Sequence, residues 1–170
     1  MTSAGPSDLT QQGARVPIDR EHPRVYQAQV QVALAVRTAV AEAGLDRTLI
    51  ELVNIRVSQI NGCAFCLHTH VRDALAAGET PQRLAVLPAW RDTTLFTDPE
   101  RAALTLAESL TTLPDVRIQN SDYTEAGDVL TAEQVSAVGW TVIAMNAFNR
   151  ISIFSRHQVR VTPAPRKDTP

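Results

Sequence analysis

The chain has 170 residues, with 16 lysines and arginines, 18 aspartates and glutamates, and a formal net charge of −2. This length suits one domain whose apolar core needs neither a disulfide nor a metal to hold it together. A slightly acidic chain lacks the basic surface that nucleic acid or an anionic membrane requires, so we expect neither as a partner.

The two ends of the chain differ in character from its middle. Residues 1–20 and 162–170 are polar and interrupted by prolines, so we expect flexible tails around a single helical domain at residues 21–161. The N-terminus lacks the charged flank and apolar run of a secretory signal, which predicts a cytoplasmic protein. In that reducing compartment, two isolated cysteines favour catalysis, redox sensing or metal binding over a permanent structural disulfide.

Apolar residues recur at helical rather than alternating spacing, which predicts an all-α fold, a compact domain of several helices. The first long helix ends before Gly44. The second begins after Asp46 and is too apolar for an exposed surface. Asn61-Gly62 interrupts it, and a third helix runs from Cys63 to about Ala77.

Later helices are indicated by their first residues. Thr80-Pro81 and Asp98-Pro99 each supply an N-cap followed by a proline in the first turn. Thr131 and Gln134 fit a capping box, in which each residue's side chain binds the backbone amide of the other. These signals predict three further helices.

The final helix, from about Ala132 to Arg156, is apolar on nearly all sides. Asn146, Asn149 and Arg150 interrupt it, and such groups are costly in hydrocarbon, which argues against a membrane span. We expect the helix to be buried on most sides, in part at a subunit interface of a homo-oligomer. The three polar residues are candidates for a buried network that anchors it.

Several other residues are expected to be structural or solvated. Large aromatic side chains supply buried area wherever they occur, which favours a core or interface position for Phe65, Trp90, Trp140 and Phe148. His22 and His157 have no identifiable partner and are expected to be solvated, with His68 at the surface or rim. Arg72 and Asp73 are expected on a solvated face.

Both cysteines lie in the segment Cys63-Ala64-Phe65-Cys66, and His70 follows four residues later. In a regular helix, positions i and i+3 place their β-carbons roughly 5–6 Å apart. A disulfide needs about 3.5–4.5 Å. Because Asn61-Gly62 breaks the preceding helix, Cys63 can leave helical geometry, and a reversible disulfide can close.

Two effects compete to decide which cysteine is the nucleophile. The free amides of a helix N-terminus favour a thiolate at Cys63, whereas His70 can accept the proton of Cys66. We favour Cys66 as the attacking sulfur, with Cys63 resolving the intermediate, and the dipole argument leaves the reverse assignment open. Glu51 would orient His70 if it reaches that ring; otherwise it is a solvated carboxylate paired with Arg47.

A hydroperoxide is the substrate that suits this dithiol. The thiolate would attack a peroxide oxygen, and the resulting sulfenic acid would condense with the second cysteine to a disulfide. An external dithiol must then reduce that disulfide, and no bound cofactor is required. Zinc held by Cys63, Cys66, His68 and His70 is disfavoured, because His68 and His70 point to different helix faces. We therefore expect no metal.

Four residues at fixed spacing, E-x11-C-x2-C-x3-H, are Glu51, Cys63, Cys66 and His70. With SQINGCAFC, DALAAGET, LPAWRDTTLFTDPERAAL and NAFNRI, this pattern resembles the alkylhydroperoxidase D-like branch of the carboxymuconolactone decarboxylase superfamily, from about residue 21 to residue 161. The resemblance implies an all-helical oligomer, often a trimer or hexamer, and a peroxidase that uses the CxxC dithiol. It also implies that Glu51 and His70 form a proton relay.

The resemblance has one clear departure. The founding peroxidase of the family has a histidine between its two cysteines, where this chain has Phe65, so that part of the relay is absent. Two alternative functions remain. One is a redox-sensing oligomer in which turnover is incidental. The other is a lactone decarboxylase-like or other non-redox enzyme, which the retention of both cysteines disfavours.

Overall fold

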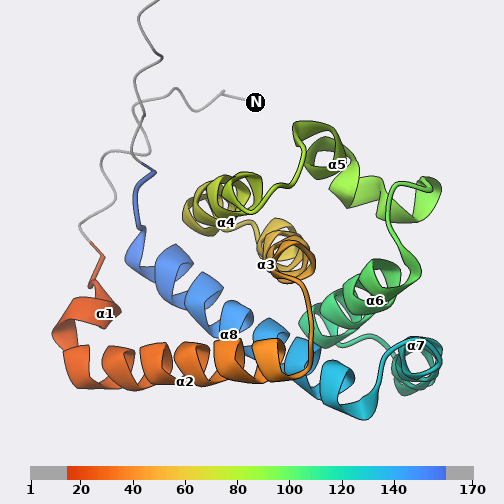
Figure 1. Ribbon diagram of the computed structural model, residues 1–170. Helices are drawn as coiled ribbons and strands as arrows, with labels where there is room; N and C mark the ends of the chain where they lie inside the picture. Colours follow the sequence, from red (N-terminus) through yellow and green to blue (C-terminus); the bar gives the residue numbers. More distant parts are fainter. Residues whose placement is uncertain (1–14, 160–170) are drawn as a thin grey trace, which may run out of the picture.

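The computed structural model describes residues 15–159, and within that range its regular secondary structure is helical, without strands, as expected for an all-α fold (Figure 1). Of the tails, residues 1–14 and 160–170 lie outside the described range, and helix already begins at Ile18, ahead of the expected domain boundary at residue 21. The elements in chain order are α1 (Ile18–Glu21), α2 (Pro23–Glu42), α3 (Arg47–Asn61), α4 (Ala64–Ala76), α5 (Pro81–Val86), the 3-10 helix η2 (Leu87–Asp92), α6 (Asp98–Thr112), α7 (Val116–Gly127) and α8 (Ala132–Ser155).

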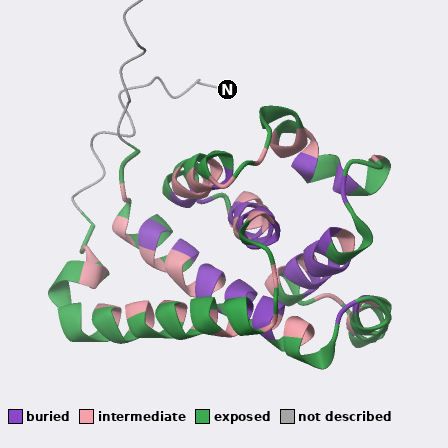
Figure 2. Ribbon diagram, viewed as in Figure 1, coloured by how far each residue is buried: buried purple, intermediate pink, exposed green. Residues whose placement is uncertain are grey.

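Helix α3 lies at the centre of the domain. It packs mainly against α4, α6 and α8, while α2 lies along α8 and α7 against α6 (Figure 1). Both sides of α3 are therefore buried, as its apolar sequence predicts: Leu52 and Ile55 contribute to one core cluster, and Val53 and Val57 to the other. Figure 2 shows α3 and α6 as largely buried helices, whereas α2 is mostly exposed.

Most helix boundaries follow from the capping residues in the sequence. Gly44 and Gly62 adopt positive φ after α2 and α3, and Thr131 with Gln134 forms the expected capping box of α8. The expected N-cap Asp98 is wrong: α6 is capped by Thr97, whose backbone amide donates to Glu100 Oε2 at 2.8 Å. Either residue type can cap a helix, and the reach of Glu100 decides between them.

Within a single chain, helix α8 is buried on one side. One side packs into the core through Val138, Val142 and other residues, but Trp140 and Ile143 on the opposite side are 52% and 51% exposed, and Phe154 is 52% exposed. Of the two positions expected for the large aromatic residues, core or interface, Trp90 confirms the core at 3% exposure, whereas Trp140 does not lie in the core of a single chain. Among residues 15–159, no helix has the length and hydrophobicity needed to cross a bilayer.

Candidate active site

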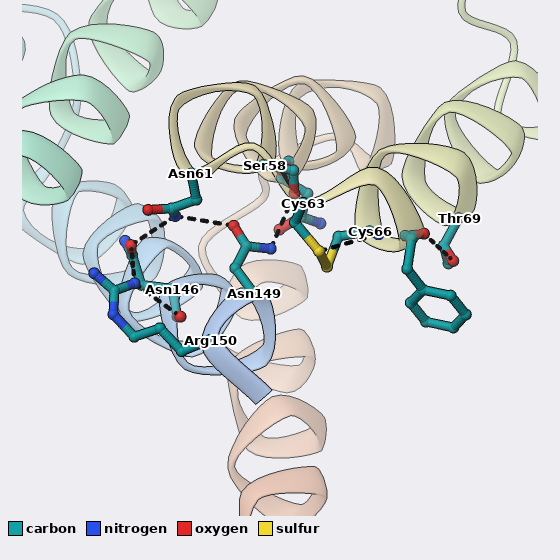
Figure 3. Close-up of a disulfide and its surroundings, with 10 residues drawn as sticks. Ser58, Asn61, Cys63, Cys66, Thr69, Asn146, Asn149 and Arg150 are labelled. Atoms are coloured by element: carbon teal, nitrogen blue, oxygen red, sulfur yellow. Dashed lines mark hydrogen bonds between the residues drawn. A yellow bond between two sulfur atoms is a disulfide. The ribbon is translucent and has the colours of Figure 1, made fainter. Parts of the chain in front are cut away.

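The two cysteines form a disulfide at the junction of α3 and α4 (Figure 3). Gly62 ends α3 with φ of 70°, in the left-handed region that glycine tolerates. Cys63 is then extended and acts as the N-cap of α4, so its Cα lies 5.3 Å from that of Cys66. The expectation that the helix break lets this pair close is confirmed.

Both cysteines are buried, at 2% and 3% exposure for Cys63 and Cys66. The Cys66 amide donates to the Cys63 sulfur at 3.3 Å. The Cys63 amide donates to the Ser58 carbonyl at 3.0 Å. The same Cys66 N–H can stabilise a thiolate on Cys63, as can the open end of α4. This geometry supports the dipole argument for Cys63 and leaves the choice of nucleophile to experiment.

Glu51 reaches His70 across the helix break. Its Oε2 lies 2.7 Å from His70 Nδ1, and its Oε1 accepts a hydrogen bond from Arg47 Nε at 2.9 Å. Both expected contacts of Glu51 therefore exist together. The carboxylate is not solvated, however, because Glu51 is only 4% exposed.

The contacts around Glu51 keep it ionised. Burial alone would raise the pKa of Glu51, but the hydrogen bond and charge of His70, with further hydrogen bonds from Arg47 and Asn54, lower that pKa below its ordinary value. A carboxylate at Nδ1 also fixes the orientation of the imidazole ring and leaves Nε2 as the nitrogen able to accept a proton.

His70 lies one helical turn after Cys66 on the same face of α4, where i and i+4 side chains are neighbours. His68 is exposed, as expected for a rim residue. The group with metal-ligating atoms close together is instead Glu51, His70 and Asp73, whose atoms lie within 4.8 Å of one another. The expected solvated face for Asp73 is thus only partly correct, since its side chain is 27% exposed and lies beside Glu51 and His70. Its spacing, three residues after His70, is the signal that could have found it.

A polar network holds the helix break against α8 (Figure 3); of the three residues expected to form a buried network, Asn149 is buried, Asn146 is partly buried and Arg150 is exposed. Asn149 is fully buried; its Oδ1 accepts from Asn61 Nδ2 at 2.9 Å, and its Nδ2 donates to Ser58 Oγ at 3.2 Å. Asn61 also donates to Asn146 Oδ1 at 2.9 Å, and Arg150 binds the same oxygen at 2.7 Å. The network anchors the residues immediately before Cys63.

A second contact near the cysteines was not expected. The ring of His157 packs against that of Phe65 with centroids 5.2 Å apart, and His157 Nε2 lies 3.3 Å from Asp19 Oδ1. The expectation that His157 is solvated is therefore wrong. Its partner comes from α1, which lies beside the end of α8 (Figure 1). No local sequence pattern connects residues so far apart in the chain.

Comparison with known proteins identifies relatives for most of this fold. A profile of the carboxymuconolactone decarboxylase family matches residues 23–109. Uncharacterized protein YdfG of Bacillus subtilis (strain 168) is 39% identical over 112 residues, covering 66% of this chain and 76% of that protein. Uncharacterized protein YnjA of Escherichia coli (strain K12) is 38% identical over 71 residues, covering 41% of this chain and 38% of that protein.

A solved structure extends the likeness to the whole fold. It is a protein of unknown function from Agrobacterium tumefaciens, described as a candidate antioxidant defence protein AhpD. It superposes with a TM-score of 0.76 at 26% identity, covering 88% of this chain and 99% of that chain. The family profile itself spans α3, the helix break and α4, and so includes Glu51, both cysteines and His70. The chain belongs to the carboxymuconolactone decarboxylase family.

Proposed function

We propose that the protein is a thiol-dependent peroxidase that reduces hydroperoxides through the Cys63 and Cys66 dithiol. The observation that carries this proposal is the 2.7 Å contact between buried Glu51 and His70 Nδ1, one turn from a CxxC pair that closes into a disulfide. An oriented base beside a cysteine is the arrangement that activates a thiol nucleophile. The AhpD-like structural neighbour supports the same class of reaction.

In the oxidative half of the cycle, His70 takes the proton of the Cys66 thiol. The thiolate attacks one oxygen of the hydroperoxide, the O–O bond breaks, and the proton passes to the departing alkoxide to give an alcohol. Cys66 is now a sulfenic acid. The Cys63 sulfur attacks it and expels water, so the two thiols have given two electrons to the peroxide and become a disulfide.

In the reductive half, an external dithiol attacks the disulfide, and Cys63 leaves as a thiolate. The Cys66 amide and the N-terminus of α4 stabilise that thiolate, and a stabilised thiolate is a good leaving group. The second donor thiol then displaces Cys66. The donor ends as a disulfide, and the protein regains two thiols.

We also propose that the protein is a homo-oligomer, with a trimer or hexamer as the expected size. Trp140 and Ile143, about half exposed on the outer face of α8, support this. Large exposed apolar side chains in such a group are typical of protein interfaces. Light scattering of the wild type and of Trp140→Glu tests it: the variant should dissociate, and a monomeric wild type would contradict the proposal.

The peroxidase proposal is tested by mixing reduced protein with an alkyl hydroperoxide and counting free thiols as the peroxide disappears. Both thiols should be lost together, and a dithiol donor should restore them over many cycles. Cys66→Ser should abolish consumption, and Cys63→Ser should leave a sulfenic acid that a dimedone-type reagent traps. Trapping at Cys63 in Cys66→Ser instead would reverse the assignment of the two cysteines.

Other outcomes identify the alternative functions. A single oxidation without turnover by any dithiol would indicate a redox sensor. Two thiols that persist in excess peroxide would reject the proposal. An activity on a lactone that survives replacement of both cysteines would indicate a non-redox enzyme of the same family.

A further inference from the structure

A second carboxylate lies beside the Glu51 and His70 pair. Asp73 follows His70 by three positions and Cys66 by seven, which places all three side chains on one face of α4. One oxygen of Asp73, one of Glu51 and a ring nitrogen of His70 all lie within 4.8 Å of one another. The cycle proposed above uses Glu51 and His70 but gives Asp73 no role.

Side-chain exposure increases from Glu51 through His70 to Asp73. The Glu51 side chain is 5% exposed, that of His70 is 20% exposed, and that of Asp73 is 27% exposed. The two cysteines are at most 3% exposed. Asp73 is therefore the member of the group with the freest access to water, and the sulfurs have almost none.

The proposed reaction requires protons to move between solvent and the buried cysteines. Reducing the disulfide to two thiols takes up two protons, which the donor dithiol releases as it becomes a disulfide. Protons released outside the protein have to reach buried sulfur atoms. Glu51 is closed to solvent and hydrogen-bonded to Arg47, so it is the inner end of the group rather than its outlet.

The charges in the cluster suit a proton better than a metal ion. Arg47 from α3 pairs with Glu51 at 2.9 Å, and Arg72 from α4 pairs with Asp73 at 2.8 Å. Each carboxylate thus already has a cationic partner. A divalent cation would add two positive charges beside two arginines, whereas an imidazole between two carboxylates gains and loses only one.

We propose that Asp73 is the outer member of a proton path formed by Glu51, His70 and Asp73, and that it exchanges protons between His70 and solvent. The role in catalysis rests on the proposed peroxidase function. A separation below 4.8 Å is short enough for one water molecule to bridge. Asp73 acts through His70, so it is a positioning residue rather than a catalytic one.

The experiment compares wild type with Asp73→Asn in two separate half-reactions near neutral pH. One is oxidation of the reduced protein by an alkyl hydroperoxide in a single turnover, and the other is reduction of the disulfide by dithiothreitol. We expect the variant to be slower by about tenfold in the dithiothreitol reaction, less than the roughly 10²–10⁴-fold contributed by a direct acid–base group. Added formate, a small acid that can carry protons in place of the side chain, should restore most of the rate. Asp73→Glu should retain most of it without formate.

Glu125→Gln is the matched control, because Glu125 is an exposed carboxylate on α7. It should react as fast as wild type and show no dependence on formate. If Asp73→Asn folds poorly, Asp73→Ser provides the same test of formate rescue. A rate for the Asp73 variants within twofold of wild type would overturn the proposal, and so would a slow rate that formate does not restore.

Two further results separate this inference from its alternatives. Stoichiometric binding of Zn²⁺ to the oxidised protein that is lost in Asp73→Asn would overturn it in favour of a metal site. Suppose instead that wild type does not react with hydroperoxides, but Asp73→Asn is still reduced more slowly than wild type by dithiothreitol and formate restores the rate. The peroxidase function then fails and the proton path stands.

Discussion

Replacement of Glu51 by glutamine should prevent His70 from acting as the base, although the imidazole itself is unchanged. In wild type, Glu51 accepts from both Arg47 Nε and His70 Nδ1, so His70 carries its proton on Nδ1 and can accept another on Nε2. A glutamine has one oxygen and one nitrogen. Arg47 can only donate, so it takes the oxygen, and the amide nitrogen turns to His70. Nδ1 then has to accept, and the proton moves to Nε2, the wrong tautomer for taking a proton from Cys66.

The size of this effect has two bounds. Loss of one charge-assisted hydrogen bond is worth about 1.5–3 kcal/mol, which corresponds to roughly 10- to 10²-fold in rate. Complete loss of the base sets the upper bound, at roughly 10⁴-fold. We therefore expect Glu51→Gln to slow oxidation by hydroperoxide by at least about tenfold, measured by stopped flow under pseudo-first-order conditions.

Glu108→Gln is the control for this variant. Glu108 is also a largely buried carboxylate with arginine partners, and it accepts from Arg56 Nε at 2.7 Å and from Trp90 Nε1 at 2.9 Å. It has no contact with the relay in the described residues, so its replacement should cost stability while the rate constant stays near wild type. Equal rate constants for Glu51→Gln and wild type would refute the tautomer argument, and equal losses in the two variants would show a general effect on folding.

Three further predictions concern stability. Asn149→Ala removes two hydrogen bonds at a fully buried position, those with Asn61 and Ser58, and should lower the free energy of unfolding by about 2–4 kcal/mol in urea denaturation; a loss below about 1 kcal/mol would show that the network does not anchor the site. Gly62→Ala has open space for the new methyl group but keeps a positive φ, so it should cost about 1–2 kcal/mol, and an unchanged melting temperature would contradict this. The pKa values of Glu51 and Glu108 are lowered below 4.5 in the folded protein, so their contribution is fully present above the unfolded value and is lost as the pH falls through the lower, folded values. The free energy of unfolding should therefore decline below about pH 4.5 in wild type and decline less steeply in Glu51→Gln. Equal slopes in the two proteins would contradict a lowered pKa for Glu51.

The sequence was most informative where local chemistry decides the structure. Asn61-Gly62 predicts the helix break because a glycine alone takes the left-handed backbone there at little cost, and the disulfide geometry follows from that break. The contact between Glu51 and His70 depends instead on how α3 packs against α4. Spacing alone left it open, and the family resemblance was needed to expect it.

Features that depend on the packing of distant segments were missed. The Asp19 and His157 pair joins α1 to the segment that follows α8, so neither neighbourhood in the sequence contains a sign of it. Helix α7 was not expected either, because its polar composition gives little apolar periodicity. The exposure of Trp140 shows a different limit: apolar composition indicates that a surface will be covered, but it does not say whether the same chain covers it.

In the proposed peroxidase cycle, Phe65 leaves proton transfer at the dithiol to a single imidazole, that of His70. It lies between the two cysteines, and its ring packs against His157, whose Nε2 is already held by Asp19. A phenyl ring neither gives nor accepts a proton, so the transfer at the dithiol falls to His70 and to the carboxylates that contact it. A relative with a second histidine at this position has another route for the proton. Loss of Glu51 or His70 should therefore cost this protein more of its rate than the same change costs such a relative.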